Sequence, residues 1–232
     1  MRKLGLIGGT GPESTVDYYQ AIIAKYQEKT GNNEELPEFL INSINMYKIF
    51  ELLEKGKTED LTDYLALAVL ALEKAGAEYA VLTANTAHIV FEEVQKEVGI
   101  PLISIVEETA RTADKMKLEK IGLLGTKFTM ENDFFPQIFA AAQKEIVVPN
   151  QQEQDFIHEK IVEELEKGIV EPETKDAFLK IVSRMAEQNG IQGVILGCTE
   201  LPMLIKPEDS AIPQMNTTEI HVEAIVEAML RE

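Results

Sequence analysis

The chain has one cysteine and no tryptophan among its 232 residues, and aromatic side chains make up 6% of it. A single cysteine excludes a disulfide bond within the chain and suits a reducing compartment, so we expect a cytoplasmic location. The three histidines, His88, His158 and His221, lie far apart and lack the spacing of metal ligands. We therefore expect no bound metal ion.

Positive charge is also scarce, because 22 Lys and Arg residues stand against 40 Asp and Glu residues and give a formal net charge of −18. Nucleic acids and anionic membranes are bound by clustered positive charge, so neither is an expected partner. No apolar run approaches the ~20 residues that cross a bilayer, and the run after Arg2-Lys3 is too short for a signal peptide. A small anionic substrate stays possible, because it needs only local hydrogen-bond donors.

Short apolar segments alternate with helical patterns along the whole chain, which predicts an α/β fold with parallel sheets. The expected strands are residues 4–7, 39–44, 78–82, 101–104, 121–124, 145–148, 194–196 and 211–214. The expected helices are residues 12–29, 47–53, 61–74, 86–98, 105–115, 129–144 with an interruption near Pro136, 153–167, 173–188 and 219–230. In such folds ligands bind beyond the carboxyl ends of strands.

Two pairs of segments repeat at about half the length of the chain. Lys3–Gly8 matches Lys120–Gly125, and the stretch from Gly76 matches the stretch from Gly190, which aligns Ala84 with Cys198. Self-similarity at this scale predicts two pseudo-symmetric lobes, each a parallel sheet flanked by helices. We expect a first lobe of residues 1–113 plus 208–232, a second lobe of residues 114–207, and an active site in the cleft between them.

The glycine-rich stretch Gly8-Gly9-Thr10-Gly11 follows the first strand and opens the first helix. It is not a dinucleotide-binding loop, because Ser14 stands where the third glycine belongs and no acidic residue closes the second strand. Backbone N–H groups at the start of a helix suit a carboxylate. A tight turn without a ligand is the other interpretation of this loop.

Cys198 lies where a strand, Val194-Ile195-Leu196, gives way to the start of a helix. Free N–H groups and the positive end of a helix dipole favour a thiolate, which would suit a nucleophile or a base. The alternative is a small buried apolar residue, as many lone cysteines are.

Four motifs taken together resemble the cofactor-independent aspartate/glutamate racemase family. They are residues 5–15 (GLIGGTGPEST), 84–88 (ANTAH), 122–130 (GLLGTKFTM) and 196–202 (LGCTELP), and the resemblance covers essentially the whole chain. It implies two α/β lobes with the active site between them, a homodimer, amino-acid substrates, and no pyridoxal phosphate or metal.

The resemblance also implies roles for individual residues. Racemisation moves a proton off one face of Cα and onto the other, so it needs two acid/base groups. Family members typically have one cysteine in each lobe, and here Cys198 is present while Ala84 replaces the other. The resemblance therefore implies Cys198 as one catalytic group and Thr83, or a water molecule, as the other. Thr83 is one residue away from the matching position, and neighbouring side chains on a strand point to opposite faces.

The remaining motif positions imply a substrate-binding set. Those that match the family directly are Thr10, Asn85, Thr86, Thr199 and Glu200. The internal repeat adds Thr126 and Lys127, and Lys48 is the nearest candidate cation for a distal carboxylate of the substrate.

Three hypotheses about function follow. The first is a racemase of aspartate or glutamate that needs no pyridoxal phosphate. The second is a single-cysteine lyase or isomerase of a dicarboxylic acid, since Ala84 leaves one proton donor. The third is a binding protein that keeps the pocket without turnover.

Overall fold

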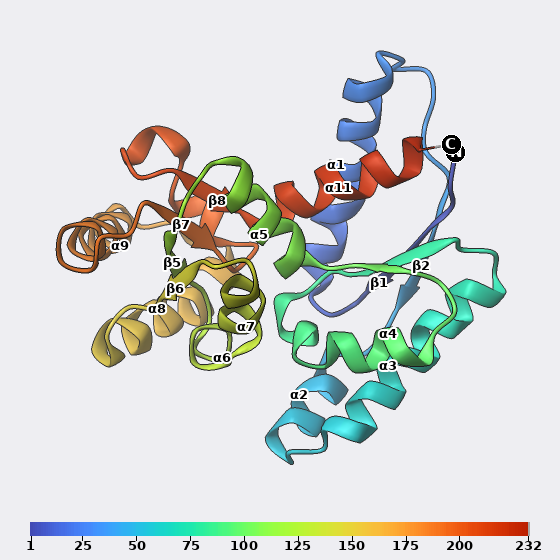
Figure 1. Cartoon of the computed structure of the whole chain (residues 1–232), viewed down its shortest axis with the longest axis horizontal. Helices are drawn as coiled ribbons and strands as arrows, with labels where there is room; N and C mark the ends of the chain where they lie inside the picture. The colour runs from blue at the N-terminus through green and yellow to red at the C-terminus, as the bar shows by residue number, and fades with distance from the viewer. Residues whose placement is uncertain (232) are drawn as a thin grey trace. The chain divides into compact units, whose positions relative to one another are not determined.

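The computed structural model describes residues 1–231, which form two compact lobes (Figure 1). Lobe 1 contains Met1–Glu108 and the C-terminal segment from His221, and lobe 2 is Thr109–Ile220. The chain thus crosses between lobes twice, after Glu108 and after Ile220. Within the described residues no helix is both long and apolar enough to cross a membrane.

Lobe 1 is built on a four-stranded parallel sheet with the order β2-β1-β3-β4. The strands are β1 (Leu4–Gly8), β2 (Phe39–Ser43), β3 (Tyr79–Leu82) and β4 (Leu102–Ile103). Strand β1 pairs with β2 on one side and with β3 on the other, and Leu4 lies opposite both Phe39 and Tyr79. All residues of β1 and β3 are buried, as expected for parallel strands covered on both faces.

Helices cover both faces of this sheet. On one face α1 (Pro12–Thr30) and α11 (Thr217–Leu230) pack around Tyr18, Ile22 and Ile225. On the other lie α2 (Met46–Glu54), α3 (Thr58–Lys74), the 3-10 helix η1 (Asn85–Val90) and α4 (Phe91–Glu97) (Figure 1). Helix α5 (Ile105–Lys115) begins in lobe 1 and carries the chain into lobe 2.

Lobe 2 repeats the topology with the order β6-β5-β7-β8, again all parallel. Its strands are β5 (Lys120–Leu124), β6 (Glu145–Val147), β7 (Gly193–Leu196) and β8 (Gln214–Asn216). Its helical segments are α6 (Lys127–Glu131), α7 (Phe134–Ala141), α8 (Gln151–Glu163), η2 (Leu165–Lys167), α9 (Pro172–Arg184), the π-helix η3 (Met185–Asn189), α10 (Leu201–Leu204) and η4 (Pro207–Asp209). The matching strand orders confirm the predicted α/β class and the pseudo-symmetric pair of lobes.

Two predicted elements were misplaced. The break in the helix of residues 129–144 lies at Asn132 and Asp133, and Pro136 sits in the first turn of α7, where proline is tolerated. The last strand begins at Gln214 and runs to Asn216, later than the predicted 211–214. Pro213 has no N–H for a ladder, but its carbonyl accepts the Val194 N–H at 2.9 Å and starts the pairing.

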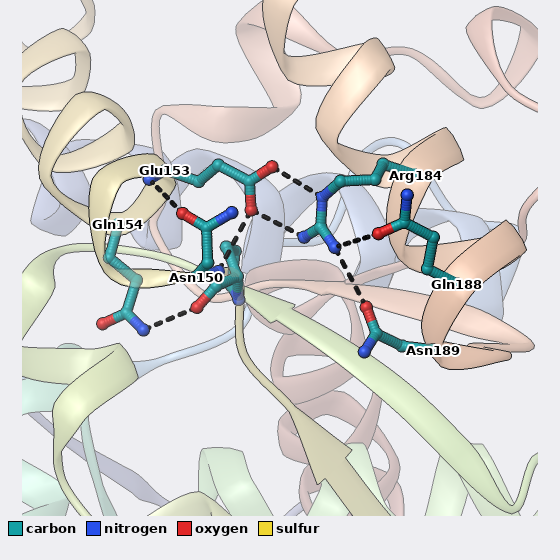
Figure 2. Close-up of polar contacts among 7 residues, drawn as sticks. Asn150, Glu153, Gln154, Arg184, Gln188 and Asn189 are labelled. Carbon is teal, nitrogen blue, oxygen red and sulfur yellow. Dashed lines mark hydrogen bonds and ion pairs between the residues drawn. The ribbon is translucent and has the colours of Figure 1, made fainter.

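Arg184 joins the end of α9 to the start of α8 (Figure 2). Its guanidinium donates two hydrogen bonds of 2.6 Å to the carboxylate of Glu153, and further bonds to Gln188 and Asn189 in η3. Glu153 also accepts the Asn150 N–H at 3.0 Å, and Asn150 caps α8 in return. One carboxylate therefore serves both a helix cap and a bridge between helices.

We predict that Arg184→Met lowers the free energy of unfolding by about 1–3 kcal/mol, because it leaves the largely buried Glu153 without its charged partner. Urea denaturation would measure the change. Lys167→Met is the matched control: it removes the partner of the exposed Glu163 and should leave the midpoint unchanged. Equal effects of the two substitutions would contradict the assignment.

Candidate active site

The turn after β1 is held tightly against the start of α2. Gly9 has φ of +73°, and a Cβ there would lie 2.2 Å from the carbonyl oxygen of Ile44. The Gly9 N–H donates to the hydroxyl of Thr15 at 2.8 Å. Because no other residue fits at Gly9, the turn is fixed and places Thr10 directly beyond the carboxyl end of β1.

Thr10 and Thr83 meet at the ends of two adjacent strands. Their hydroxyl oxygens are 3.1 Å apart, and the Thr83 hydroxyl donates to the carbonyl of Ile7 at 2.9 Å. Because the Thr83 hydroxyl hydrogen is used in that bond, the Thr10 hydroxyl is the donor and the Thr83 oxygen the acceptor of the bond between them. The Thr83 side chain is 1% exposed, while Thr10 is half-buried. The hydroxyl of this pair that solvent or a ligand can reach is therefore that of Thr10.

The turn of Ala84, Asn85 and Thr86 follows β3, and all three residues are partly exposed. Buried His88 fixes its backbone, since Nδ1 lies 3.0 Å from the Ala84 carbonyl and Nε2 lies 3.0 Å from the Ile105 N–H. A carbonyl must accept and an N–H must donate, so Nδ1 carries the proton and the imidazole is neutral. Burial lowers the pKa of His88 to about 4, against the smaller opposing effect of the Ala84 carbonyl.

A second neutral imidazole holds the end of β4. His221, which is fully buried, lies 3.0 Å from the Ile103 carbonyl through Nε2 and 2.9 Å from the Tyr18 hydroxyl through Nδ1. Nε2 therefore donates and Nδ1 accepts. Burial is the main cause that lowers the pKa of His221 to about 3. Neither histidine is among the predicted catalytic residues: His88 bridges two backbone segments, and His221 joins the Ile103 carbonyl to the Tyr18 hydroxyl.

In lobe 2 the polar side chains of the turn after β5 bond other groups of the same lobe. The Thr126 hydroxyl caps α6 by accepting the Thr129 N–H, and it lies 3.2 Å from the Thr129 hydroxyl. The Lys127 amine bonds Asp155 of α8 at 2.6 Å. Both residues that the internal repeat singled out are thus engaged within lobe 2.

The turn after β7 presents the only thiol. The Gly197 N–H donates to the Leu124 carbonyl at 2.7 Å, and a Cβ at Gly197 would lie 2.9 Å from that same oxygen. Glycine is required for this close approach of backbone to backbone. The Thr217 hydroxyl donates to the Leu196 carbonyl at 3.0 Å and secures the end of the strand. Cys198 follows Gly197 as the second residue after β7 and is half-buried.

Glu200 organises the thiol and its neighbour. The Cys198 thiol donates to Glu200 Oε2 at 2.8 Å, and the Thr199 hydroxyl donates to Oε1 at 2.8 Å. Burial, followed by the charge of Glu200 and its hydrogen bond, raises the pKa of Cys198 well above its usual value. The expected stabilisation of a thiolate by backbone N–H groups is outweighed here, because the Glu200 N–H lowers the pKa of Cys198 less than burial and the Glu200 carboxylate raise it.

The predicted cation for a distal carboxylate, Lys48, lies over the ring of Tyr64 on α3, 4.1 Å from its centroid. The Tyr64 hydroxyl accepts the Asn45 N–H at 3.0 Å, and Asn45 caps α2. Tyr64 thus contacts the β2–α2 turn at Asn45 and the Lys48 ammonium in the first turn of α2.

Sequence reasoning missed several residues around these turns. The hydroxyl of Ser14 donates to the Thr83 carbonyl at 3.0 Å, and Thr15 supports Gly9; their place just after the glycine-rich turn was the available signal. The negative charge of Glu166, in η2, also raises the pKa of Cys198, with a smaller effect than Glu200. Nothing in the sequence pairs Glu166 with that thiol. Within residues 1–231 no group of three His, Cys, Asp or Glu side chains could hold a metal ion.

Comparisons with known proteins place this arrangement in a family. Residues 7–225 match the model of the Asp/Glu/hydantoin racemase family, and the chain belongs to that family. An aspartate racemase homologue from Pyrococcus horikoshii OT3 is 38% identical, with full coverage of both chains and a TM-score of 0.88. The broad specificity amino-acid racemase RacX of Bacillus subtilis (strain 168) is 24% identical over 93% of this chain and 92% of its own. The Picrophilus torridus aspartate racemase, 20% identical over 98% of this chain and 94% of its own, shares the fold with a TM-score of 0.74.

We predict that Glu200→Gln lowers the pKa of Cys198, because it removes the negative charge that opposes ionisation of the thiol. The rate of alkylation by iodoacetamide as a function of pH reports this pKa, and the single cysteine makes the signal unambiguous. Glu166→Gln should give a smaller shift in the same direction. An unchanged or raised pKa in Glu200→Gln would contradict the role assigned to the carboxylate.

We also predict that protein stability falls as pH drops from about 6.5 toward 4. The pKa of His88 is about 4 in the folded chain and about 6.5 when unfolded, so the unfolded chain binds more protons in this window. Between pH 7 and pH 5 the loss from His88 is about 2 kcal/mol. In His88→Gln the stability should decline less over the same window. Urea midpoints at each pH give the two slopes, and parallel slopes would refute the prediction.

Proposed function

We propose that this protein is an amino-acid racemase that acts on aspartate or glutamate without pyridoxal phosphate, as a cytoplasmic homodimer. The observation that carries the proposal is the hydrogen-bonded pair of Cys198 and Glu200 at the end of β7, in a chain of the racemase family. The name of RacX, a broad specificity racemase, and of the aspartate racemase homologue support the reaction class.

Cys198 supplies one of the two proton transfers. In the folded chain it is a thiol whose proton faces Glu200, so the carboxylate can take that proton as substrate binds. The resulting thiolate removes the Cα proton, and the electron pair passes to the substrate carboxylate. Hydroxyl groups and backbone N–H groups then stabilise the developing negative charge.

The second transfer is assigned to Thr83 or to a water molecule at the other face of Cα. The Thr83 hydroxyl is buried and already donates to Ile7, which favours a water held by Thr10 over direct contact with Thr83. Such a water gives a proton to the other face of Cα and regains one from the surrounding solvent, and Glu200 gives up the proton that it took from Cys198. The reverse path deprotonates the opposite enantiomer.

The proposed substrate-binding groups are the partly exposed turn residues Thr10, Asn85, Thr86 and Thr199. Glu200 is engaged with Cys198 and Thr199, so we assign it to activating the thiol. A distal carboxylate would draw on Lys48 or Lys127, which must then leave the Tyr64 ring or Asp155.

Proton NMR in D₂O tests the proposal with L- and D-aspartate and L- and D-glutamate. We expect wild-type protein to exchange the Cα proton of both enantiomers of one of these acids. Cys198→Ala should slow exchange of one enantiomer by about 10²–10⁴-fold, the usual contribution of a positioned acid or base. Thr10→Val should slow exchange of the other enantiomer more than Thr83→Val does.

The outcomes separate clearly. Unchanged exchange in Cys198→Ala would refute the role of the thiol. Absence of exchange in wild type with all four compounds would refute the substrate assignment. A larger loss in Thr83→Val than in Thr10→Val would favour Thr83 as the direct base.

Ala84 favours a second candidate, a lyase or isomerase of a dicarboxylic acid. Its methyl group cannot move a proton, and a single delivery by Cys198 completes such a reaction. Turnover of a malonate or maleate without Cα exchange in any amino acid would establish this alternative.

A further inference from the structure

Four buried polar side chains of lobe 1 form a hydrogen-bonded network that the proposed proton transfers do not use. They are Ser14, Tyr18, His88 and His221, which we call the two-histidine network, and each is at most 7% exposed. A buried donor or acceptor is costly to leave unpaired, so each bond in such a network constrains the next one.

Helix α1 contributes the first two members of the network. Ser14 and Tyr18 are four residues apart and therefore lie on the same face of the helix. The Ser14 hydroxyl donates to the Thr83 carbonyl at 3.0 Å, and the Tyr18 hydroxyl donates to Nδ1 of His221 at 2.9 Å. One turn of α1 thus connects the end of β3 to His221 on α11.

The two imidazoles hold the short connection between β4 and α5 at its two ends. Nε2 of His221 donates to the Ile103 carbonyl at 3.0 Å, and the Ile105 N–H donates to Nε2 of His88 at 3.0 Å. Only Ser104 separates the two bonds. It is buried, and its hydroxyl accepts a backbone N–H in the first turn of α5 at 3.3 Å. A displacement at one imidazole is therefore passed to the other across a single, fixed residue.

The network closes on the turn that follows β3. Nδ1 of His88 donates to the Ala84 carbonyl at 3.0 Å, and the preceding carbonyl, that of Thr83, is the one that Ser14 holds. Two adjacent carbonyls of this turn are thus fixed, one through α1 and the other through His88. The next two residues, Asn85 and Thr86, are proposed substrate-binding groups.

The position of each imidazole proton is set by the backbone group that faces it. The Ile103 carbonyl requires a donor, so His221 carries its proton on Nε2 and accepts from Tyr18 through Nδ1. The Ile105 N–H requires an acceptor, so His88 carries its proton on Nδ1. The two imidazoles therefore have opposite tautomers, and the loss of any one bond leaves a buried group of its neighbour unpaired.

We infer that His221 is a positioning residue for the candidate active site, and that it acts through residues 103–105 and His88 on the turn that carries Asn85 and Thr86. Its own bonds go to Tyr18 and Ile103, so its effect on the turn is indirect. The effect on a substrate rests on the proposed function, whereas the coupling between the two imidazoles can be measured without turnover.

NMR tests the coupling with a matched pair of variants, Tyr18→Phe and Tyr79→Phe. Both tyrosines are 1% exposed and both hydroxyls bond α11, but Tyr79 donates to the Ile225 carbonyl at 3.0 Å, outside the network. In wild type, ¹H–¹⁵N spectra of the histidine rings should show His88 protonated on Nδ1 and His221 on Nε2. The His88 ring proton and the Ile105 amide should exchange with solvent about 10-fold faster in Tyr18→Phe than in Tyr79→Phe, which corresponds to about one hydrogen bond.

Steady-state kinetics of Cα exchange test the effect on the site. His221→Leu should raise the KM of both enantiomers by about 10–100-fold, because a displaced turn weakens contacts that both enantiomers share. This pattern differs from that of Cys198→Ala, which affects one enantiomer. His221→Gln retains a donor for the Ile103 carbonyl and should recover most of the loss, and Tyr79→Phe should leave the KM unchanged.

Three results would overturn the inference: a wild-type His88 protonated on Nε2, equal exchange of the His88 and Ile105 protons in Tyr18→Phe and Tyr79→Phe, or an unchanged KM in an active His221→Leu variant. The first two need no turnover, and Tyr18→Phe keeps its ring in place, so they stand even if His221→Leu does not fold. Coupled imidazoles in a protein that exchanges none of the four amino acids would support the network while refuting the racemase. An active enzyme with uncoupled imidazoles would do the reverse.

Discussion

The burial of the central strands of each sheet is the constraint on which the rest of the structure depends. β1, β3 and β7 are buried along their whole length because neighbouring strands and helices enclose them. A polar side chain within such a strand loses its water and needs a partner inside the protein, as the Tyr79 hydroxyl finds at the Ile225 carbonyl. The candidate site residues lie instead in the turns that follow these strands, among them Thr10, Asn85 and Cys198. Glycine makes two of these turns possible, since Gly9 and Gly197 bring backbone within contact of backbone.

The polar groups at these turns are satisfied mainly by backbone atoms. Thr83 donates to Ile7, Ser14 to Thr83, Thr217 to Leu196, and the neutral imidazoles of His88 and His221 each hold a carbonyl. Bonds of this kind fix side-chain rotamers and tautomers together. The turns are thereby held in place before any ligand binds, which is what a site that orients a small substrate requires.

The sequence was sufficient to predict the fold and the location of the turns, but not the partners of the side chains. Apolar runs and glycines set the strand ends, and the repeat at Gly8 and Gly125 predicted two equivalent sheets. Lys127 and Asp155 are 28 residues apart, and Lys48 and Tyr64 are 16 apart, so their pairing follows from helix packing that no local pattern encodes. The helix break was predicted near Pro136 but lies at Asn132 and Asp133. Proline is as compatible with the first turn of a helix as with its end, so its position alone did not locate the break.

The acidity of the chain and the protonation of its thiol are connected. A thiolate at Cys198 would lie beside Glu200 and near Glu166, in a half-buried position where like charges repel strongly. The resting state is therefore a thiol with a carboxylate beside it, which can exchange a single proton but cannot carry two negative charges at low cost. In the proposed racemase an incoming α-ammonium group would offset that charge before ionisation. The substrate itself would then add to the limited stabilisation that the Glu200 N–H gives the thiolate.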